Sequence, residues 1–422
     1  MKKQLICGID IGSSKIATLV VLFNEDVNDL PKVIGFASSS SLGIKKGLVV
    51  DIDKATEAIE KSIDRAEKMA GYKIEKAFVS VGGPHISSLN SHGLVAITNP
   101  NQEISSSDVG RVIEAARAIS LSSTREIIEV VPCDFIVDGQ GGIKNPVGMT
   151  GVRLEVDTHI ITASQTNLKN IDHCFSNLGV ENQGYIFAGL ASAEAVLTDT
   201  EKELGVLLVD IGAGKIDLCL YQEGSLIYSS SIPVGGRHIT NDIAVGLRVS
   251  LESADKIKIY LSNNLNLLTS KKKINEINLK DLGLSEDLSN VSLKSLINEI
   301  ITPRLEEIFK LIFEEIEKNG LTEKIPAGLV ITGGASQTLG IIEIAKKTVA
   351  LPVRVGLPGK ISGLIDEVME PSYATIVGLV LLAKNKLTKG EIDFKNFTKV
   401  WQSFSESFSF SKLKNFFKQF IP

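Results

Sequence analysis

The chain has 422 residues, of which 43% are hydrophobic and 23% are charged, as is typical of a globular protein with room for two or more domains. Its formal net charge of -5 gives no reason to expect a nucleic-acid ligand, and it contains no apolar run of about eighteen residues that could span a membrane. Its 4 cysteines and 5 histidines lack metal-binding spacing, so we expect reduced thiols and no zinc site.

Strands and helices alternate along the chain. The N-terminal run reaches Asp10 after a short apolar stretch, so we expect a buried strand and no signal peptide there. Apolar runs ending in glycine, the pattern of strands buried on both faces, occur at 3–12, 76–83, 204–212 and 327–334. Helical patterns lie between them, at 53–71, 239–261 and 292–320. The alternation predicts an α/β fold whose sheets are covered by helices.

Two segments depart from this alternation. Residues from about 84 to 162 interrupt the first half with a helix of their own at 106–120 and a loop at 137–151 that is rich in glycine. We interpret them as an inserted subdomain. From about residue 384 the chain becomes polar with single aromatics and no clear period, which is typical of a linker.

One short motif occurs twice, as "GIDIGSSKIATLVV" at 8–21 and as "VDIGAGKIDLCLY" at 209–221. Each copy predicts a buried strand that ends in an aspartate, a turn of glycine and small residues, and a second strand. Such turns let backbone N–H groups approach phosphate oxygens, and the aspartate can hold Mg²⁺ through water. One copy alone is equally an ordinary β-hairpin. The pair predicts one phosphate site built symmetrically by two halves of the chain.

Other phosphate motifs do not fit the sequence. The chain has no GxxxxGK[ST] loop, and the segment 212–217 is followed by a strand rather than by the helix that a GxGxxG motif requires. A third element supports the pair: a buried strand ends in Gly333-Gly334, and we expect a helix to begin around Ser336 with its N-terminus toward a ligand. Such a connection is by itself more often structural.

Together, the two hairpins and the "TGGASQ" loop resemble the actin/Hsp70/hexokinase-type ATPase superfamily. Nearly the whole chain resembles the FtsA family of bacterial cell-division proteins, through segments such as "VSVGGPHISSLNSHGLVAI", "IPVGGRHITNDIA" and "PSYATIVGL". The resemblance implies a two-domain actin-like fold with ribonuclease-H-like halves, a 1C subdomain in place of actin's 1B, and a C-terminal amphipathic helix. The implied limits are 1–84, 163–195 and 367–385 for subdomain 1A, 85–162 for 1C, 196–232 and 303–366 for 2A, 233–302 for 2B, 386–407 for a flexible linker, and 408–422 for the terminal helix.

The resemblance also implies a binding site for ATP and Mg²⁺. Asp10 and Asp210 would hold the metal through water. The residues implied to contact the nucleotide are Asp10, Gly12, Ser13, Ser14, Lys15, Asp210, Gly212, Ala213, Gly214, Lys215, Gly235, Gly236, Glu252, Lys256, Gly333, Gly334 and Gln337. Without the family, Glu252 and Lys256 would be read as a solvated ion pair one helical turn apart.

Three positions depart from the family pattern. Ala213 and Lys215 replace residues of the common "DIGGGT" sequence and could narrow or retune the phosphate pocket. Ala188 stands where hydrolytic relatives place a glutamate that orients water. Because in-line attack on a γ-phosphate needs a positioned water, we expect ATP binding with slow or no hydrolysis. We do not assign Glu194, further along the same helix, as a catalytic base.

The last fifteen residues, 408–422, have an amphipathic helical pattern. The predicted apolar face consists of Phe410, Leu413, Phe416, Phe417, Phe420 and Ile421. The predicted polar face carries Lys412, Lys414 and Lys418. This pattern favours a peripheral helix on an anionic membrane surface. The alternative is a helix that docks on its own protein or on a partner.

We therefore expect an actin-like ATP-binding protein that polymerises and anchors the FtsZ ring to the cytoplasmic face of the membrane. The resemblance implies that the C-terminal tail of FtsZ docks near Arg304, and that subdomain 1C faces neighbouring protomers or later division proteins. The rival interpretations are a sugar-kinase-type phosphotransferase and a pilus-assembly actin-like ATPase.

Overall fold

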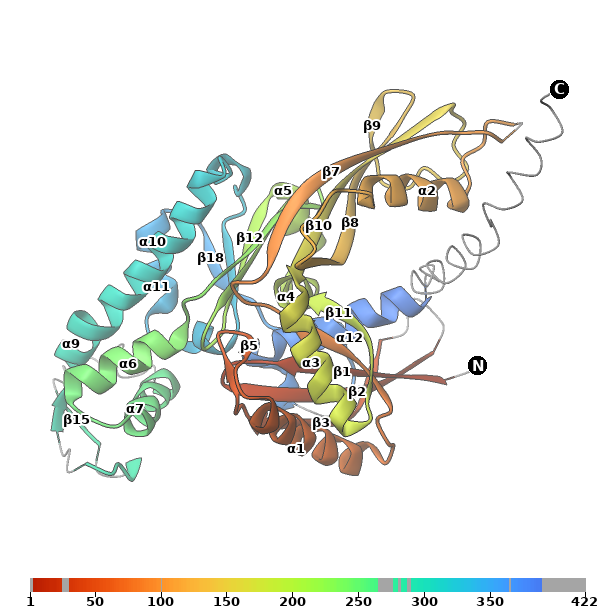
Figure 1. Ribbon diagram of the computed structural model, residues 1–422. Helices are drawn as coiled ribbons and strands as arrows, with labels where there is room; N and C mark the ends of the chain where they lie inside the picture. The colour runs from red at the N-terminus through yellow and green to blue at the C-terminus, as the bar shows by residue number, and fades with distance from the viewer. Residues whose placement is uncertain are drawn as a thin grey trace, which may run out of the picture.

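Two five-stranded sheets of the same topology form the centre of the molecule in this computed structural model (Figure 1). The structure describes residues 3–24, 30–99, 101–264, 276–279, 282–286, 290–363 and 366–388. The first sheet has the order β11-β6-β1-β2-β3, from strands Glu181–Phe187, Lys76–Val81, Lys3–Ile11, Lys15–Asn24 and Lys32–Ser40. The second has the order β18-β17-β12-β13-β14, from Val353–Val355, Leu329–Thr332, Val206–Ile211, Ile216–Gln222 and Ser225–Ile232.

The repeated motif forms the same hairpin in both sheets. Ile11 pairs with Ile16 at the end of β1 and β2, and Ile211 pairs with Ile216 at the end of β12 and β13. In each turn the glycine N–H donates to a lysine carbonyl, over 3.1 Å from Gly12 to Lys15 and 3.0 Å from Gly212 to Lys215. The predicted internal duplication is therefore a structural one.

Helices cover both faces of each sheet, and central strands such as β12 are therefore apolar on both faces. In the second sheet Val206 and Leu208 face one core and Leu207 and Val209 face another. α1 (Ile52–Ala70) and α3 (Gln165–Leu178) cover the first sheet, and α10 (Thr302–Lys318) and α11 (Ile341–Val349) cover the second. α4 (Ala188–Val196) and α12 (Ala374–Thr388) pack together between the two sheets.

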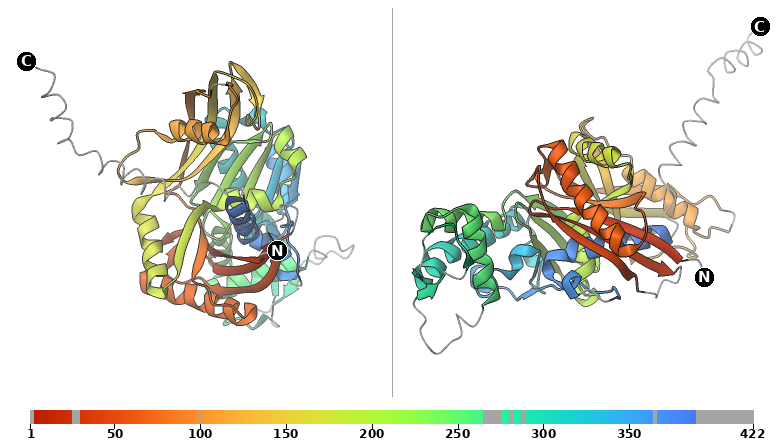
Figure 2. Two further views of the ribbon diagram at one scale, coloured as in Figure 1. Left: turned by 90° about the vertical axis from the view of Figure 1, so that its right-hand side faces the viewer. Right: turned by 90° about the horizontal axis from the view of Figure 1, so that it is seen from below.

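The inserted segment forms a separate antiparallel sheet. Its order is β7-β10-β8-β9, from Ser87–Ala96, Arg153–Ser164, Arg125–Val137 and Gln140–Ile143, and helix α2 (Ser106–Arg117) packs on it. Figure 1 shows this unit at the upper right, beyond the first sheet. At the other end lie α6 (Gly236–Leu247), α7 (Leu251–Asn263) and the short α9 (Leu293–Ser295), as Figure 2 also shows.

Several predicted elements are confirmed. Gly71 ends α1 with a left-handed φ of 72°, and α10 ends at Lys318 with Asn319 as its C-cap, followed by Gly320 with φ 66°. Cys7 and Cys219 are buried free thiols in the core, as their apolar surroundings in the sequence predicted.

Three predictions about helices were wrong. The pattern at 239–261 is two helices, because Arg248 adopts a left-handed φ of 56° and Ser250 caps α7. The segment after Gly333 is a 3-10 turn over Gly334–Gln337, and the helix begins only at Ile341. α12 continues to Thr388, into the stretch predicted as a linker from 386, and Lys386 pairs there with Glu129 over 2.7 Å.

Within the described part of the chain, no helix combines the length and the apolarity that crossing a membrane requires.

Candidate functional site

A cleft of about 720 Å³ lies where the two hairpins meet. Its walls come from the β1–β2 turn, the β12–β13 turn, the N-terminal part of α6, α7, the 333–337 turn and the start of α12. The predicted residues that line it are Asp10, Gly12, Ser13, Ser14, Lys15, Asp210, Gly212, Ala213, Gly214, Lys215, Gly236, Glu252, Gly333, Gly334 and Gln337. The structure thus brings together residues that lie more than 300 positions apart.

The two turns face each other at close range. A Cβ on Gly214 would lie 3.0 Å from Ser13 Oγ, so only glycine fits there without displacing the serine. Arg237 of α6 donates to the Ser13 carbonyl over 3.3 Å. The Gly236 N–H donates to the Gly212 carbonyl over 2.9 Å, which joins the start of α6 to the second turn. A ligand in the cleft therefore lies between the backbones of both halves.

Two of the carboxyl groups on the floor of the cleft, Asp10 and Asp210, lie at the ends of equivalent strands. Ser80 donates a hydrogen bond to Asp10, and burial raises the pKa of that carboxyl group. Ser192 and Thr375 donate to Asp210 over 2.5 Å and 3.0 Å. Burial, and then the charge of Asp217, raise the pKa of Asp210 to about 6. Hydroxyl donors thus hold both carboxylates in place at the ends of equivalent strands.

This donor set fits magnesium in its hydrated form. In the described part of the chain, no group of three or more His, Cys, Asp or Glu side chains could hold a metal ion directly. Mg²⁺ is usually bound through one or two carboxylates, waters and substrate phosphates rather than by a complete protein cage. Asp10 and Asp210 would hold it in that way, and the ion would supply positive charge to the phosphates.

The two hairpin lysines occupy different environments. Lys15 donates to Ser372 Oγ over 2.9 Å, and burial lowers the pKa of its ammonium group to about 8. Lys215 forms an ion pair with Asp217. Burial acts to lower the pKa of Lys215, but the neighbouring Asp217 and Asp210 outweigh it and raise that pKa. The structure thus directs Lys215 toward the floor of the cleft.

Two predicted contacts lie outside the lining. Gly235 precedes α6 beside the second turn, where a Cβ would lie 2.5 Å from the Gly212 carbonyl oxygen. Lys256 pairs with Glu252 over 3.1 Å and donates to the Gly283 carbonyl over 3.2 Å. On α7, Asp255 and Lys258 line the cleft instead.

Sequence reasoning missed several lining residues. They are Asp217, Arg237, Thr240, Leu251, Asp255, Lys258, Ile259, Ala335, Ser372 and Thr375. Asp217 had a usable signal, since it lies inside the repeated motif two positions after the lysine, where the first copy has Ala17. Ser372 and Thr375 belong to no phosphate motif, and only the packing of α12 between the sheets brings them to the cleft.

Ala188 is the first residue of α4, is buried, and carries no group that could orient water. A Cβ on the next residue, Gly189, would lie 3.1 Å from Asp217 Cβ, so the start of α4 lies beside the cleft floor. Glu194 is engaged elsewhere, with Lys202 over 3.1 Å and with Lys360 over 3.9 Å.

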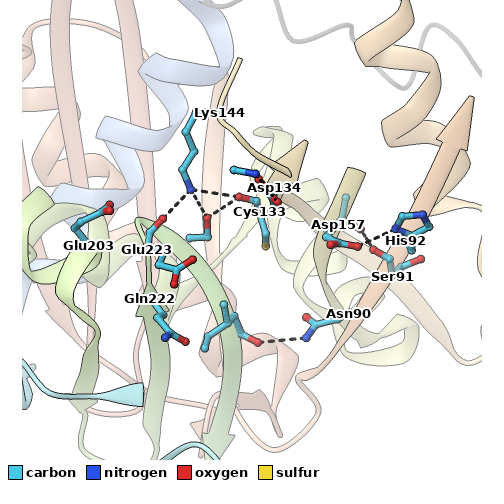
Figure 3. Close-up of a pocket in the computed structure, with 14 residues that line it drawn as sticks. Asn90, Ser91, His92, Cys133, Asp134, Lys144, Asp157, Glu203, Gln222 and Glu223 are labelled. Atoms are coloured by element: carbon cyan, nitrogen blue, oxygen red, sulfur yellow. Dashed lines mark hydrogen bonds and ion pairs between the residues drawn. The ribbon is translucent and has the colours of Figure 1, made fainter. Parts of the chain in front are cut away.

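A second cavity, of about 700 Å³, lies between the inserted sheet and β13–β14 (Figure 3). Lys144 of the insert donates to the Glu223 carbonyl over 2.7 Å and to Ser225 Oγ over 2.8 Å, as Figure 3 shows at the upper left. On the other side of the cavity the His92 ring hydrogen-bonds to the Asp157 carboxylate, and this bond raises the pKa of the imidazole. No glycine-rich turn of the two hairpins contributes to this cavity, and the bonds of Lys144 join the insert to the β13–β14 hairpin.

The remaining predicted contacts are partly outside the described residues. Arg304 of α10 forms ion pairs with Asp242 of α6 and with Glu307, so it joins two helices. The predicted membrane residues between 410 and 421 lie outside the described part of the chain.

Two sheets of one topology that enclose a cleft between matching hairpins define the actin-like ATPase fold. Solved structures agree. One from the "PilM-PilN type IV pilus biogenesis complex" superposes with a TM-score of 0.59 over 90% of this chain and 98% of that one, at 15% identity. MreB 5 of Spiroplasma citri superposes with a TM-score of 0.52 over 92% and 98%, at 14% identity. At such identities the similarity concerns the fold alone.

The family follows from the sequence. The model described as "Cell division protein FtsA" matches residues 207–378, and the one described as "SHS2 domain inserted in FTSA" matches 83–162. The FtsA protein of Pseudomonas aeruginosa is 38% identical over 387 residues, which cover 92% of this chain and 91% of that protein. That of Borreliella burgdorferi is 38% identical over 408 residues, or 95% and 97%, and that of Bacillus subtilis is 37% identical over 399, or 93% and 87%. This chain belongs to the FtsA family of cell division proteins.

Proposed function

We propose that this protein binds ATP and Mg²⁺ in the cleft between its two hairpins, polymerises, and anchors the FtsZ ring to the cytoplasmic face of the membrane, where it recruits later division proteins. The observation that carries the nucleotide proposal is the cleft itself. Asp10 and Asp210 bring equivalent carboxylates from the two halves to its floor, and glycine turns from both halves border it. The related fold of MreB 5 is recorded bound to AMPPNP.

The nucleotide proposal assigns a role to each wall. Backbone N–H groups of the 12–15 and 212–215 turns would bind the phosphates, with Lys15 as a partner of opposite charge. Asp10 and Asp210 would hold Mg²⁺ through water. The 333–337 turn and α7 would line the nucleoside. Hydrolysis is slow in this proposal, because Ala188 supplies no carboxylate for the attacking water and Glu194 is held by Lys202.

The membrane proposal depends on residues 408–422. Three lysines near an anionic surface contribute about 1 kcal/mol each, and partial burial of the aromatic face adds several kcal/mol. Ordering a short peptide into a helix offsets part of this, so one helix binds reversibly and many copies in a filament bind stably. Nucleotide, polymer and membrane binding would then be coupled. Equal lipid affinity of monomer and polymer would contradict that coupling.

The proposed protein partners are FtsZ, neighbouring protomers and later division proteins. Docking of the FtsZ tail near Arg304 requires an acidic group to compete with Asp242 and Glu307, which already pair with the guanidinium group. The insert, which forms a sheet of its own with α2, is the proposed surface for neighbouring protomers or later division proteins. We also propose the subdomain limits given above, with one change. The third segment of subdomain 1A, 367–385, is extended to Thr388, where α12 ends.

The test is co-sedimentation with anionic liposomes, with and without ATP. The whole chain is compared with a chain that ends at Ser407 and with a matched variant whose Lys412, Lys414 and Lys418 are glutamine. We expect the whole chain to pellet, more so with ATP, the shortened chain to stay in solution, and the lysine variant to bind weakly. If the whole chain stays in solution with ATP and FtsZ present, the anchor proposal fails. Phosphate transfer to a small acceptor would favour a kinase instead.

A further inference from the structure

The two hairpins differ at one position on the floor of the cleft. In the first, Asp10 pairs with Ala17 across the strands, and in the second Asp210 pairs with Asp217. Asp217 lines the cleft, and its exposed side-chain fraction is 1%. The second half therefore brings a third carboxylate to a site that has only two in a strictly symmetric arrangement.

Lys215 lies among these carboxylates. It forms an ion pair with Asp217, and its side chain is 13% exposed. Ser231 donates to the other Asp217 oxygen over 2.7 Å, so that carboxylate has a fixed orientation. The ammonium group also acts on Asp10 and Asp210, because its positive charge opposes the rise in pKa that burial causes at both carboxyl groups. One cation is thus shared by three acids.

The lysine also crosses between the two halves of the molecule. It begins in the β12–β13 turn and ends against the first half, where a Cβ on Gly82 would collide with its ammonium nitrogen. A Cβ on Gly47 would lie 3.3 Å from its Cδ. Glycine at 82 leaves room for the ion pair, and a larger residue there would displace it.

The charge balance of the floor follows from these contacts. With all groups ionised, the charged residues that line the cleft are five acids and four bases, which leave one formal negative charge, and loss of Lys215 would leave two: Asp10, Asp210, Asp217, Glu252 and Asp255 against Lys15, Lys215, Arg237 and Lys258. A polyphosphate is repelled by that charge, and the repulsion is strong because the effective dielectric constant of a buried site is well below that of water. A divalent cation is the usual remedy, since it places positive charge between carboxylates and phosphates.

We propose that the Lys215 ammonium group is a resident cation of the Asp10, Asp210 and Asp217 cluster, and that it allows a nucleoside di- or triphosphate to bind without a divalent cation. This inference rests on the proposed nucleotide site. Magnesium still binds and strengthens the complex, but it is not required for occupancy of the cleft.

The experiment measures the Kd of ADP and of AMPPNP by calorimetry, in excess Mg²⁺ and in excess EDTA, for the whole chain. The quantity of interest is the ratio of the two Kd values. For the natural chain we expect a ratio within about tenfold. For Lys215→Met we expect the EDTA value to weaken by a further tenfold or more, and the Mg²⁺ value to change much less, because the metal replaces the missing charge.

The matched control is the double variant Lys215→Met with Asp217→Asn. It removes both members of the ion pair at nearly constant size, leaves the net charge of the floor unchanged, and keeps an oxygen that Ser231 can donate to. We expect its ratio to return toward that of the natural chain. It also serves where Lys215→Met alone fails to fold, since it buries no unpaired acid.

Each outcome decides a separate point. Strict dependence of the natural chain on Mg²⁺ overturns the inference and leaves the nucleotide site intact. Equal weakening of both Kd values in Lys215→Met also overturns it, since the lysine then only joins the two halves. A double variant as dependent on Mg²⁺ as Lys215→Met overturns the charge argument. Absence of binding in either buffer removes the proposed nucleotide site itself.

Discussion

The ammonium nitrogen of Lys15 lies 3.2 Å from the centroid of the Tyr373 ring, in a cation–π contact that joins the first hairpin to the segment before α12. Glu367 accepts a hydrogen bond from the Tyr373 hydroxyl over 2.9 Å, so the ring is held in place. Lys15, which is equivalent to Lys215 in the repeated motif, therefore packs against an aromatic face, and burial lowers its pKa to about 8.

Nucleotide affinity is expected to fall as the pH rises through 8, because phosphate binds the protonated form of Lys15 and the free protein loses that proton. Above this pH the Kd of ADP should weaken by up to about tenfold per pH unit. Calorimetry between about pH 7 and about pH 9 measures the effect. Lys15→Arg keeps its charge and should remove the weakening of Kd above pH 8. A Kd of the natural chain that does not change with pH would argue against a role for Lys15.

Gly378→Ala is expected to destabilise the protein. α12 crosses α4 so closely at this point that a Cβ on Gly378 would overlap the Ala191 carbonyl oxygen, and the two helices form the layer between the sheets. Overpacking of this kind costs about 1–3 kcal/mol or more. Urea unfolding measures the loss. Leu387→Ala on the same helix is the control, because an exposed position should change stability by less than about 0.5 kcal/mol.

His159 is expected to make stability depend on pH. Burial lowers its pKa to about 4, and its ring bonds Asn90 Oδ1 over 2.7 Å and Ser229 Oγ over 2.8 Å. Below pH 6.5 the His159 side chain is protonated in the unfolded chain but stays neutral in the folded one. The neutral, buried ring therefore contributes its full stability above pH 6.5, and this contribution is lost as the pH falls toward 4.

The measurement for His159 is the slope of unfolding free energy against pH in this window. His159→Gln should flatten it by up to about 1.4 kcal/mol per pH unit relative to the natural chain. The comparison of slopes is needed because Asp210 acts in the opposite direction: its raised pKa of about 6 favours the folded state as the pH falls. Equal slopes in the two chains would show that His159 titrates with the same pKa in the folded and the unfolded state.

Lys144 and Ser225 are expected to couple energetically across the cavity between the insert and the second sheet. Their side chains are 2.8 Å apart, and Ser225 also donates to the Cys133 carbonyl over 2.6 Å. A double-mutant cycle with Lys144→Met and Ser225→Ala should give about 0.5–1.5 kcal/mol. The control pair is Lys61 and Glu57 on α1, an exposed ion pair whose coupling energy should be smaller because solvent screens it. A coupling no larger than the control would mean that the insert docks by other contacts.

Local patterns predicted the framework of the cleft well. Runs of apolar residues ending in Asp-Ile-Gly identify strands buried on both faces, and the repeat identified the two hairpins whose turns line the cleft. The predicted contacts on α6, α7 and the 333–337 turn came from the family resemblance. The division of the helix at 239–261 was missed because its apolar spacing continues through the break. Ser250, which caps α7 by accepting from the Ser253 N–H, was the available signal.

Sequence alone was sufficient for the duplicated hairpins, because the turn and its flanking strands are made by neighbouring residues and need only glycine and continuous apolar runs. It could not predict which side chains the two equivalent lysines contact. Lys15 meets Tyr373, which is distant in the chain, and Lys215 meets Asp217 and the open space at Gly82. Contacts between remote segments depend on how the sheets and α12 pack, and that packing is a property of the whole core.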